Sequence, residues 1–317
     1  MRATKGVIEL DCFPTPQLAR CSTDPAELER VLRFAELQVA AARQVHAALG
    51  AEWSALSKSE RVRALRVSYG ELTQWRYRTA LEMPPQIGRG VPTHPDRFRS
   101  AIDEHGANYD RLGAIGRLRA HSVWDERKRV YVGGVSTPAY RVMLAYGRAA
   151  ELRFRREGIT SDVLRNAVRL PDGSTVTGSG LVRGATARKV ADELVARIAR
   201  RGGDTRFIET GGDPIYAVTA GDAARAEMFR HAVDLLAGAE PGEVTAWQRA
   251  RFLLYQAPVM KRGSDAVIRT FLVAVGALLF ERPPVLEQDV DLRCLVLEQG
   301  AATIMPTDPA GIFRSSN

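Results

Sequence analysis

A short basic segment lies between two strongly apolar runs in the last quarter of the chain. The segment APVMKRGSDAVIRTF, residues 257–271, contains a dense group of polar residues and a glycine: Lys261, Arg262, Gly263, Ser264 and Asp265. Ser264 or Asp265 is typical of a helix N-cap, and the first backbone N–H groups of a helix have no partner within it. Free amides, the helix dipole and fork-shaped arginine donors together hold phosphates. The segment therefore predicts an anion-binding site.

Arg269 is the one charged residue in the apolar run that follows, about one helical turn after Asp265. Burying an unpaired guanidinium is costly, so Arg269 is expected either to face a ligand or to pair with an acid such as Asp213 or Glu243. Each polar residue here also has an ordinary explanation, as a cap or a surface charge. Their combination at one helix start favours the anion site, where Gly263 would let the backbone approach the ligand.

Other candidate residues lie earlier in the chain. Asp213, in the loop TGGDPIY, is the preferred general base or sugar-hydroxyl ligand, and Tyr216 follows it. Arg183 comes after a predicted hairpin and belongs either to the rim of a phosphate pocket or to a solvated face. His231 has apolar neighbours at helical spacing, which favours a buried core histidine over a catalyst. His121 has the pattern of a surface turn.

Apolar spacing predicts a mostly helical fold around these candidates. Ser57, with Glu60 three residues later, is a capping box that begins one of the helices. One or two further helices are expected within residues 95–120. One or two small β-hairpins interrupt the helices, and the clearest is VRLPDGSTVTG with its turn at residues 171–174. We expect this hairpin to form an exposed, mobile flap near the helix that begins at Ser264.

The chain is expected to form one domain. Residues 1–23 carry no periodic pattern and are predicted to be an irregular arm. Residues 24–317 are predicted to form a single, mostly helical domain. Within it, residues 24–120 are expected to be a helical extension and residues 121–300 the core.

Composition narrows the classes of protein further. The net charge is +8, but 40 arginines against 5 lysines indicate a general compositional bias, and no block of basic residues points to a nucleic-acid partner. The longest apolar stretch, residues 270–280, is too short to span a membrane. The three cysteines cannot all pair and include no C-x-x-C spacing, so we expect a cytoplasmic protein with no metal site and no cofactor.

The basic segment resembles the core motif of the Fic/Doc/AvrB (Fido) superfamily, H-P-F-x-x-G-N-G-R-x-x-R. Pro258 and Val259 fall on the motif's proline and apolar residue, and Gly263 and Arg269 lie near its glycines and last arginine. The resemblance covers residues 160–282, including the hairpin and the helix WQRARFLLYQAP. It departs from the family in three respects: the catalytic histidine falls on Ala257, the acidic metal ligand falls on Lys261, and the Gly-Asn-Gly of the motif is not kept.

The resemblance implies a Fido-like core and a transferase that uses a nucleotide or nucleotide-sugar donor. It does not imply metal-held pyrophosphate chemistry, because both residues for it are replaced. Arg262 and Arg269 are expected to act in catalysis with Asp213. The donor would be bound by one group of residues: Lys261, Arg262, Gly263, Ser264, Asp265, Arg269, Arg183 and Tyr216. A protein or peptide is the expected acceptor, at the flap. A non-catalytic anion-binding protein and a nucleic-acid-binding protein are the alternatives.

Overall fold

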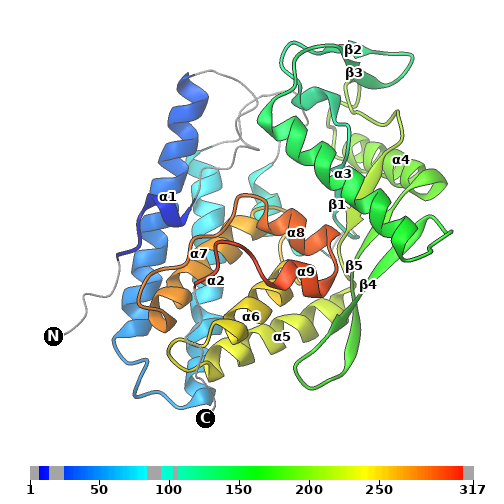
Figure 1. Cartoon of the computed structure of the whole chain (residues 1–317). Coiled ribbons are helices and arrows are strands. Elements are labelled where there is room, and N and C mark those ends of the chain that lie inside the picture. The colour runs from blue at the N-terminus through cyan, green and yellow to red at the C-terminus, as the bar shows by residue number, and fades with distance from the viewer. Residues whose placement is uncertain (1–6, 14–24, 84–93, 103–105, 310–317) are drawn as a thin grey trace.

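A computed structural model of the chain describes residues 7–13, 25–83, 94–102 and 106–309. The α-helices are α1 Pro25–Gly50, α2 Lys58–Glu82, α3 Pro138–Arg156, α4 Gly184–Arg200, α5 Asp222–Gly238, α6 Val244–Gln256, α7 Ser264–Leu279, α8 Val290–Val296 and α9 Gln299–Thr303. The strands are β1 Tyr109–Leu112, β2 Val123–Asp125, β3 Val130–Val132, β4 Val163–Arg169, β5 Thr175–Val182 and β6 Ile215–Val218. The prediction of a mostly helical fold is confirmed (Figure 1).

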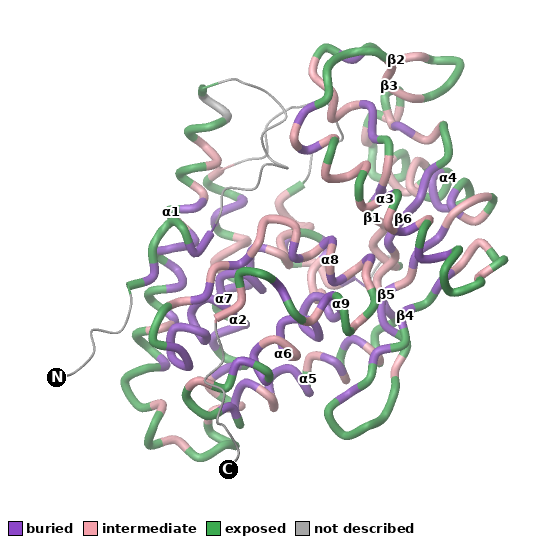
Figure 2. The backbone as a smooth tube through the Cα atoms, viewed as in Figure 1, coloured by how far each residue is buried: buried purple, intermediate pink, exposed green. Residues whose placement is uncertain are grey.

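Helix α7 lies at the centre of the helical part. Every residue from Ala266 to Leu279 is buried, and α1, α2 and α6 pack around the helix (Figures 1 and 2). The indole N–H of Trp247 on α6 donates a hydrogen bond to the carbonyl of Leu272, at 3.1 Å. Helices α1 and α2 share one hydrophobic core with α5, α6 and α7, so the expected extension is part of the main body.

A four-stranded antiparallel sheet forms the second part of the molecule, in the order β1-β6-β5-β4. Apolar residues of α3 and α8 pack with Leu112, Leu164 and Leu181 of the sheet. Residues of α4 pack with Val182 and Tyr216 in a separate cluster. The alternating side chains of the strands therefore serve two helical layers.

The predicted hairpin is confirmed as β4 and β5, and its turn at residues 171–174 is exposed. The base of the hairpin contacts the end of α6, where the backbone N–H of Ser179 donates to Oε1 of Gln256 at 2.8 Å. The turn itself lies against α5, because Asp172 reaches His231. The expectation that the hairpin lies over the start of α7 is corrected accordingly. A second, smaller hairpin joins β2 and β3.

The predicted capping box of α2 is confirmed, since Ser57 and Glu60 exchange the two expected hydrogen bonds. The prediction of one or two helices within residues 95–120 is confirmed only as two short 3₁₀ helices in the described part of that range, η3 (Pro95–Phe98) and η5 (Gly116–Leu118), with strand β1 between them. The left-handed glycines Gly106 and Gly113 leave too few residues between them for a helix. The intervening segment pairs with β6 instead.

The first residues of the chain contribute to the core where the structure describes them. A single 3₁₀ turn, η1 (Leu10–Cys12), brings Ile8, Cys12 and Phe13 into the main hydrophobic cluster. Residues 7–13 are therefore packed, and the rest of the predicted arm lies outside the described residues. Among the described helices, none has the length and apolar character needed to cross a membrane.

Candidate functional site

The loop between α6 and α7 is held by backbone pairing with residues 100–102. The N–H of Lys261 donates to the carbonyl of Ser100 at 3.0 Å, and the N–H of Ile102 donates to the carbonyl of Val259 at 3.2 Å. The side-chain amide of Asn108 donates to the carbonyl of Lys261 at 3.2 Å. These bonds place the next residue, Arg262, beside η3 and β1.

Gly263 has a packing role in this loop. Its φ of +82° is left-handed, and a Cβ on it would lie 2.8 Å from Arg76 Cγ and from Phe98 Cδ1. Arg76 is itself held over two rings, 4.2 Å from the centroid of Phe98 and 5.0 Å from that of Phe34. The expectation that Gly263 lets a ligand approach is corrected, because protein atoms fill that space.

Arg262 is exposed, and no hydrogen bond or ion pair within the described residues holds its guanidinium. Together with burial, the positive charge of Arg262 lowers the pKa of two other arginines, Arg97 and Arg117. Burial, together with the charges of Arg262 and Arg201, lowers the pKa of Arg97 to about 10. Burial also lowers the pKa of Arg117, where Glu209 opposes the effect and Arg262 adds to it. Arg262 is thus the shared neighbour of two arginines whose charged forms are already disfavoured.

The carboxylate of Asp110, on β1, interacts electrostatically with Arg262 and Arg97. The residue is open to solvent but crowded by protein, so desolvation raises its pKa, against the opposing charges of Arg262 and Arg97. We refer to Arg97, Arg117, Arg201, Arg262 and Asp110 as the arginine cluster. Its residues come from η3, η5, the end of α4, the α6–α7 loop and β1.

A buried carboxylate positions the η5 side of the arginine cluster. Glu209 accepts hydrogen bonds from the backbone N–H of Gly116 at 2.7 Å and of Arg117 at 3.3 Å. Its own carbonyl accepts from the guanidinium of Arg111 at 2.5 Å, and Gly211 accepts from the same guanidinium at 2.9 Å. Glu209 therefore holds the backbone of η5 in place and also pairs with Arg117, whose Nη1 lies 3.9 Å from Oε2 of Glu209.

Both terminal nitrogens of the Arg269 guanidinium have partners within the protein. Its Nη2 lies 3.1 Å from Oδ1 of Asp265, which also accepts from the hydroxyl of Tyr255 at 3.0 Å. The guanidinium further donates to three carbonyls, those of Leu286, Glu287 and Gln288. The expected ligand role of Arg269 and its alternative pairs with Asp213 or Glu243 are corrected, because Asp265 is its acid. Arg269 therefore holds residues 286–288, which lead into α8, against α7.

Asp291, on α8, interacts electrostatically with Asp265 and Arg269 and also with Asp110 of the arginine cluster. The pKa of Asp291 is raised to about 7, mainly by burial and then by the charges of Asp265 and Asp110. The charge of Arg269 and a hydrogen bond from the Leu292 amide oppose this rise. Oδ1 of Asp291 is buried, and no described residue donates a hydrogen bond to it. A carboxyl that titrates near neutrality is a candidate for acid–base chemistry. Sequence reasoning missed it, because an aspartate in the first turn of a helix is common.

The other predicted site residues lie elsewhere or have internal roles. Asp213 is fully exposed, 3.6 Å from Arg188. Burial raises the pKa of Tyr216, which packs in the sheet against α4. Arg183 pairs with Glu151 at 3.0 Å and lies over the ring of Phe154.

Two further predicted residues of the basic segment, Ser264 and Lys261, are directed into the protein. The Ser264 hydroxyl donates to the carbonyl of Met260 at 3.0 Å, so Ser264 does not cap α7; Gly263 is the N-cap. The side chain of Lys261 is buried. Of the predicted site residues, Arg262 belongs to the arginine cluster, whereas Asp265 and Arg269 pair with each other near Asp291.

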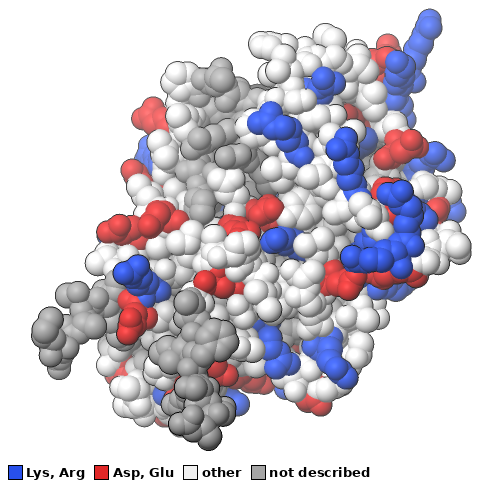
Figure 3. All heavy atoms as spheres, viewed as in Figure 1, with Lys and Arg blue, Asp and Glu red and all other residues white. Residues whose placement is uncertain are grey.

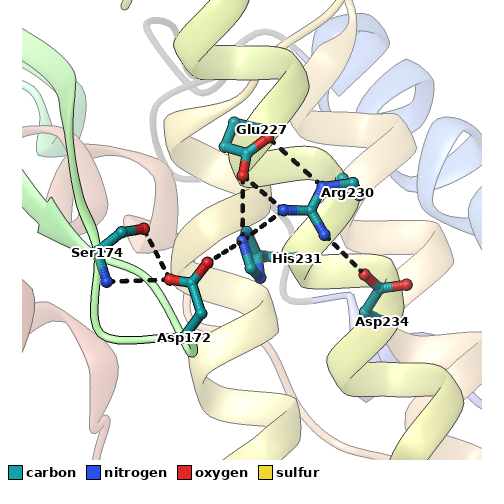
Figure 4. Close-up of polar contacts among 6 residues, drawn as sticks. All are labelled: Asp172, Ser174, Glu227, Arg230, His231 and Asp234. Carbon is teal, nitrogen blue, oxygen red and sulfur yellow. Dashed lines mark hydrogen bonds and ion pairs between the residues drawn. The ribbon is translucent and has the colours of Figure 1, made fainter.

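His231 is buried, as predicted, but its ring contacts charged groups rather than only apolar ones. The carboxylates of Asp172 and Glu227 lie beside it (Figure 4). Within the described part of the chain, these three side chains form a group close enough together to hold one metal ion.

In comparisons with known proteins, no family model matches the chain and no curated protein is significantly similar to it. The resemblance to the Fido superfamily therefore stays a prediction.

Proposed function

We propose that the protein is a transferase that binds a phosphate-bearing donor, a nucleotide or a nucleotide sugar, on the arginine cluster. The observation that supports this is the environment of Arg262. Its guanidinium has no hydrogen-bonded partner among the described residues, and it adds to the unfavourable charge on Arg97 and Arg117. A bound phosphate would relieve this repulsion and would supply acceptors with the geometry that guanidinium groups match.

The balance of charges in the arginine cluster fits a dianionic group better than a neutral ligand. The four guanidinium groups of the arginine cluster have two carboxylates near them, those of Asp110 and Glu209. Oε2 of Glu209 lies 3.9 Å from Nη1 of Arg117, and the same carboxylate accepts two backbone hydrogen bonds, so positive charge is still in excess. Fixed cations that are in place before the ligand arrives also stabilise charge that develops on a phosphate during group transfer.

Asp110 is the group that favours transfer over binding alone. It is open to solvent beside Arg262, and its pKa is raised by desolvation, so it can accept a proton more readily than an ordinary surface aspartate. We assign it the removal of the proton from an acceptor hydroxyl. Asp291, which interacts electrostatically with Asp110, is a second proton acceptor close by.

The test is a ligand screen by thermal shift with nucleotides and nucleotide sugars, followed by assays of turnover for those that bind. A ligand at 100 times its dissociation constant stabilises the folded state by about 2.7 kcal/mol. Asp110→Asn removes a negative charge beside the donor, so it should tighten donor binding and abolish transfer. Donor binding without turnover in the wild type would leave a non-catalytic binding protein. No binding of any phosphate compound would reject the proposal.

A second candidate, nucleic-acid binding, is supported by a different surface. Arg141, Arg148 and Arg155 are exposed on α3 at seven-residue spacing, which keeps them on one face of the helix. Figure 3 shows Lys and Arg side chains gathered over the part of the molecule that holds α3. Binding of DNA or RNA that weakens steeply with salt, and that Arg148→Ala reduces, would favour this candidate.

A further inference from the structure

The turn of the β4–β5 hairpin and helix α5 bring one imidazole and two carboxylates together, outside the site described above. Glu227 and His231 are four residues apart and therefore lie on the same face of α5. Asp172, in the hairpin turn, reaches them from a different part of the chain (Figure 4). Their possible ligand atoms all lie within 4.8 Å of one another.

No protonation state of Nε2 in His231 satisfies all three of its polar neighbours. Nε2 of His231 lies 3.4 Å from Oδ2 of Asp172 and 3.2 Å from Oε1 of Glu227, and both oxygens are acceptors. The same nitrogen lies 2.8 Å from Nη2 of Arg230, which can only donate. A proton on Nε2 suits the carboxylates and opposes Arg230. A bare Nε2 suits Arg230 and leaves three lone pairs directed at one another.

We propose that Asp172, Glu227 and His231 bind a divalent transition-metal ion, with Zn²⁺ as the best-fitting candidate. A cation between the three atoms uses the lone pair of Nε2 and both carboxylate charges at once. Tetrahedral zinc with bonds of about 2.0–2.1 Å has ligand atoms about 3.3–3.4 Å apart. The separations of 3.4 Å and 3.2 Å from Nε2 are close to that spacing.

Neighbouring groups already orient the ligands and can release Arg230. The backbone N–H and the hydroxyl of Ser174 both donate to Oδ1 of Asp172, at 3.0 and 2.7 Å, which leaves Oδ2 directed at His231. Nη2 of Arg230, which lies beside Nε2, also pairs with Oε1 of Glu227, so metal binding would displace both contacts. Nη1 keeps its ion pair with Asp234 at 3.3 Å, which gives the guanidinium an acid to turn to. Such outer partners fix ligand orientation in metal sites.

The bound ion would fasten the hairpin to the helical part. A two-stranded ribbon is marginal by itself, and the far end of this one contacts α5 through an exposed turn. Asp172 and Glu227 are both partly exposed, so solvent can enter and fill the remaining coordination position. The expected ligand set is therefore one nitrogen, two protein oxygens and a water.

The test is calorimetric titration of the full-length protein, freed of metal with a chelator, with ZnCl₂. One equivalent of Zn²⁺ should bind, and Asp172→Asn or Glu227→Gln should each weaken binding at least about tenfold. Arg230→Gln should strengthen it, because it removes the competing cation. Asp234→Asn, which alters a partner of Arg230 but no ligand, is the matched control and should not weaken it.

A Co²⁺ titration identifies the ligand atoms independently. Co²⁺ bound by this group should give visible absorption without the near-ultraviolet thiolate band that cysteine ligands produce. Asp172 lies in an exposed turn, so its replacement is not expected to affect folding. Zn²⁺ binding that is absent, or that neither carboxylate variant changes, or that carries the thiolate band, overturns the proposal.

Discussion

Arg262 and Arg269 come from the same basic segment, yet their surroundings differ completely. Arg269 is 2% exposed and has Asp265 and three backbone carbonyls as partners. Arg262 is exposed, has no hydrogen bond among the described residues, and lies near other arginines. The difference arises from what distant segments bring to each guanidinium. Residues 286–288 bring acceptors to Arg269, whereas η3 and η5 bring more positive charge to Arg262.

Charged residues that are clustered at the start of one helix therefore need not belong to the same site. One half of the predicted anion site stabilises the fold, and the other half is available to a ligand. Substitutions in the two halves should therefore change different measured quantities: the free energy of unfolding for Arg269 and the free energy of ligand binding for Arg262.

The largest effect is expected for Arg269→Met. This change leaves Asp265 and the carbonyls of residues 286–288 without their donor, so the free energy of unfolding should fall by about 3–5 kcal/mol. Urea denaturation measures it. Arg262→Met is the matched control and should change stability by no more than about 0.5 kcal/mol. An Arg269→Met variant as stable as the wild type, but unable to bind the donor, would erase the distinction between the two arginines.

Asp291→Asn tests the group between the two regions, because Asp291 lies near both Asp265 and Asp110. Its folded-state pKa of about 7 lies above the unfolded value, so the folded state holds the proton longer. Wild-type stability should therefore fall as the pH rises from about 4 to 7, and the variant should lack this fall. At pH 8 the variant should be more stable by roughly 2–4 kcal/mol.

The same variant should match the wild type more closely as the pH approaches 4, which provides the internal control. Urea unfolding of both proteins at several pH values gives the two curves. Parallel curves across pH 4 to 8 would show that Asp291 ionises normally and would separate it from the arginine cluster.

Arg262→Ala should weaken binding of a phosphate-bearing ligand by about 1.5–3 kcal/mol, the range for a charged hydrogen bond. The stability of the unliganded protein should stay the same or rise slightly, because repulsion with Arg97 and Arg117 is removed. Calorimetric titration with the best nucleotide from the screen measures the loss. Arg148→Ala, another exposed arginine, is the control and should bind the ligand normally.

Arg183→Ala should have the smallest effect, and only on stability. Its pair with Glu151 is partly exposed and its guanidinium lies 4.1 Å from the ring centroid of Phe154, so about 1 kcal/mol should be lost. Thermal unfolding detects a change of that size. Ligand affinity should be unaltered; a clear loss of affinity would return Arg183 to the binding site that the sequence suggested.

Local signals in the sequence predicted the elements they control. The capping box of Ser57 and Glu60, the hairpin turn at residues 171–174 and the buried apolar helix after Gly263 are all present. Each depends on residues a few positions apart. The segment from residue 95 to 120 was misjudged because β1 exists only through its pairing with β6, more than a hundred residues later.

The candidate site was predictable only where it belongs to one segment. Arg262 follows from the basic turn, but its neighbours Arg97, Arg117 and Asp110 come from other elements and have no pattern of their own. The same holds for His231, whose apolar neighbours in the sequence gave no sign of Asp172. Long-range contacts decide which charges meet, and no local spacing encodes them.

The complete burial of α7 has a consequence for the timescales on which the two ends of the site move. Amide protons along Ala266–Leu279 have no route to water except through opening of the whole helical core, so they should exchange with deuterium most slowly. The α6–α7 loop that carries Arg262 is only partly buried, so its amides should exchange sooner. Helix α7 would then stay in place while the loop that carries Arg262 rearranges around each arriving ligand, and ligand preference could change over evolution without disturbing the helical core.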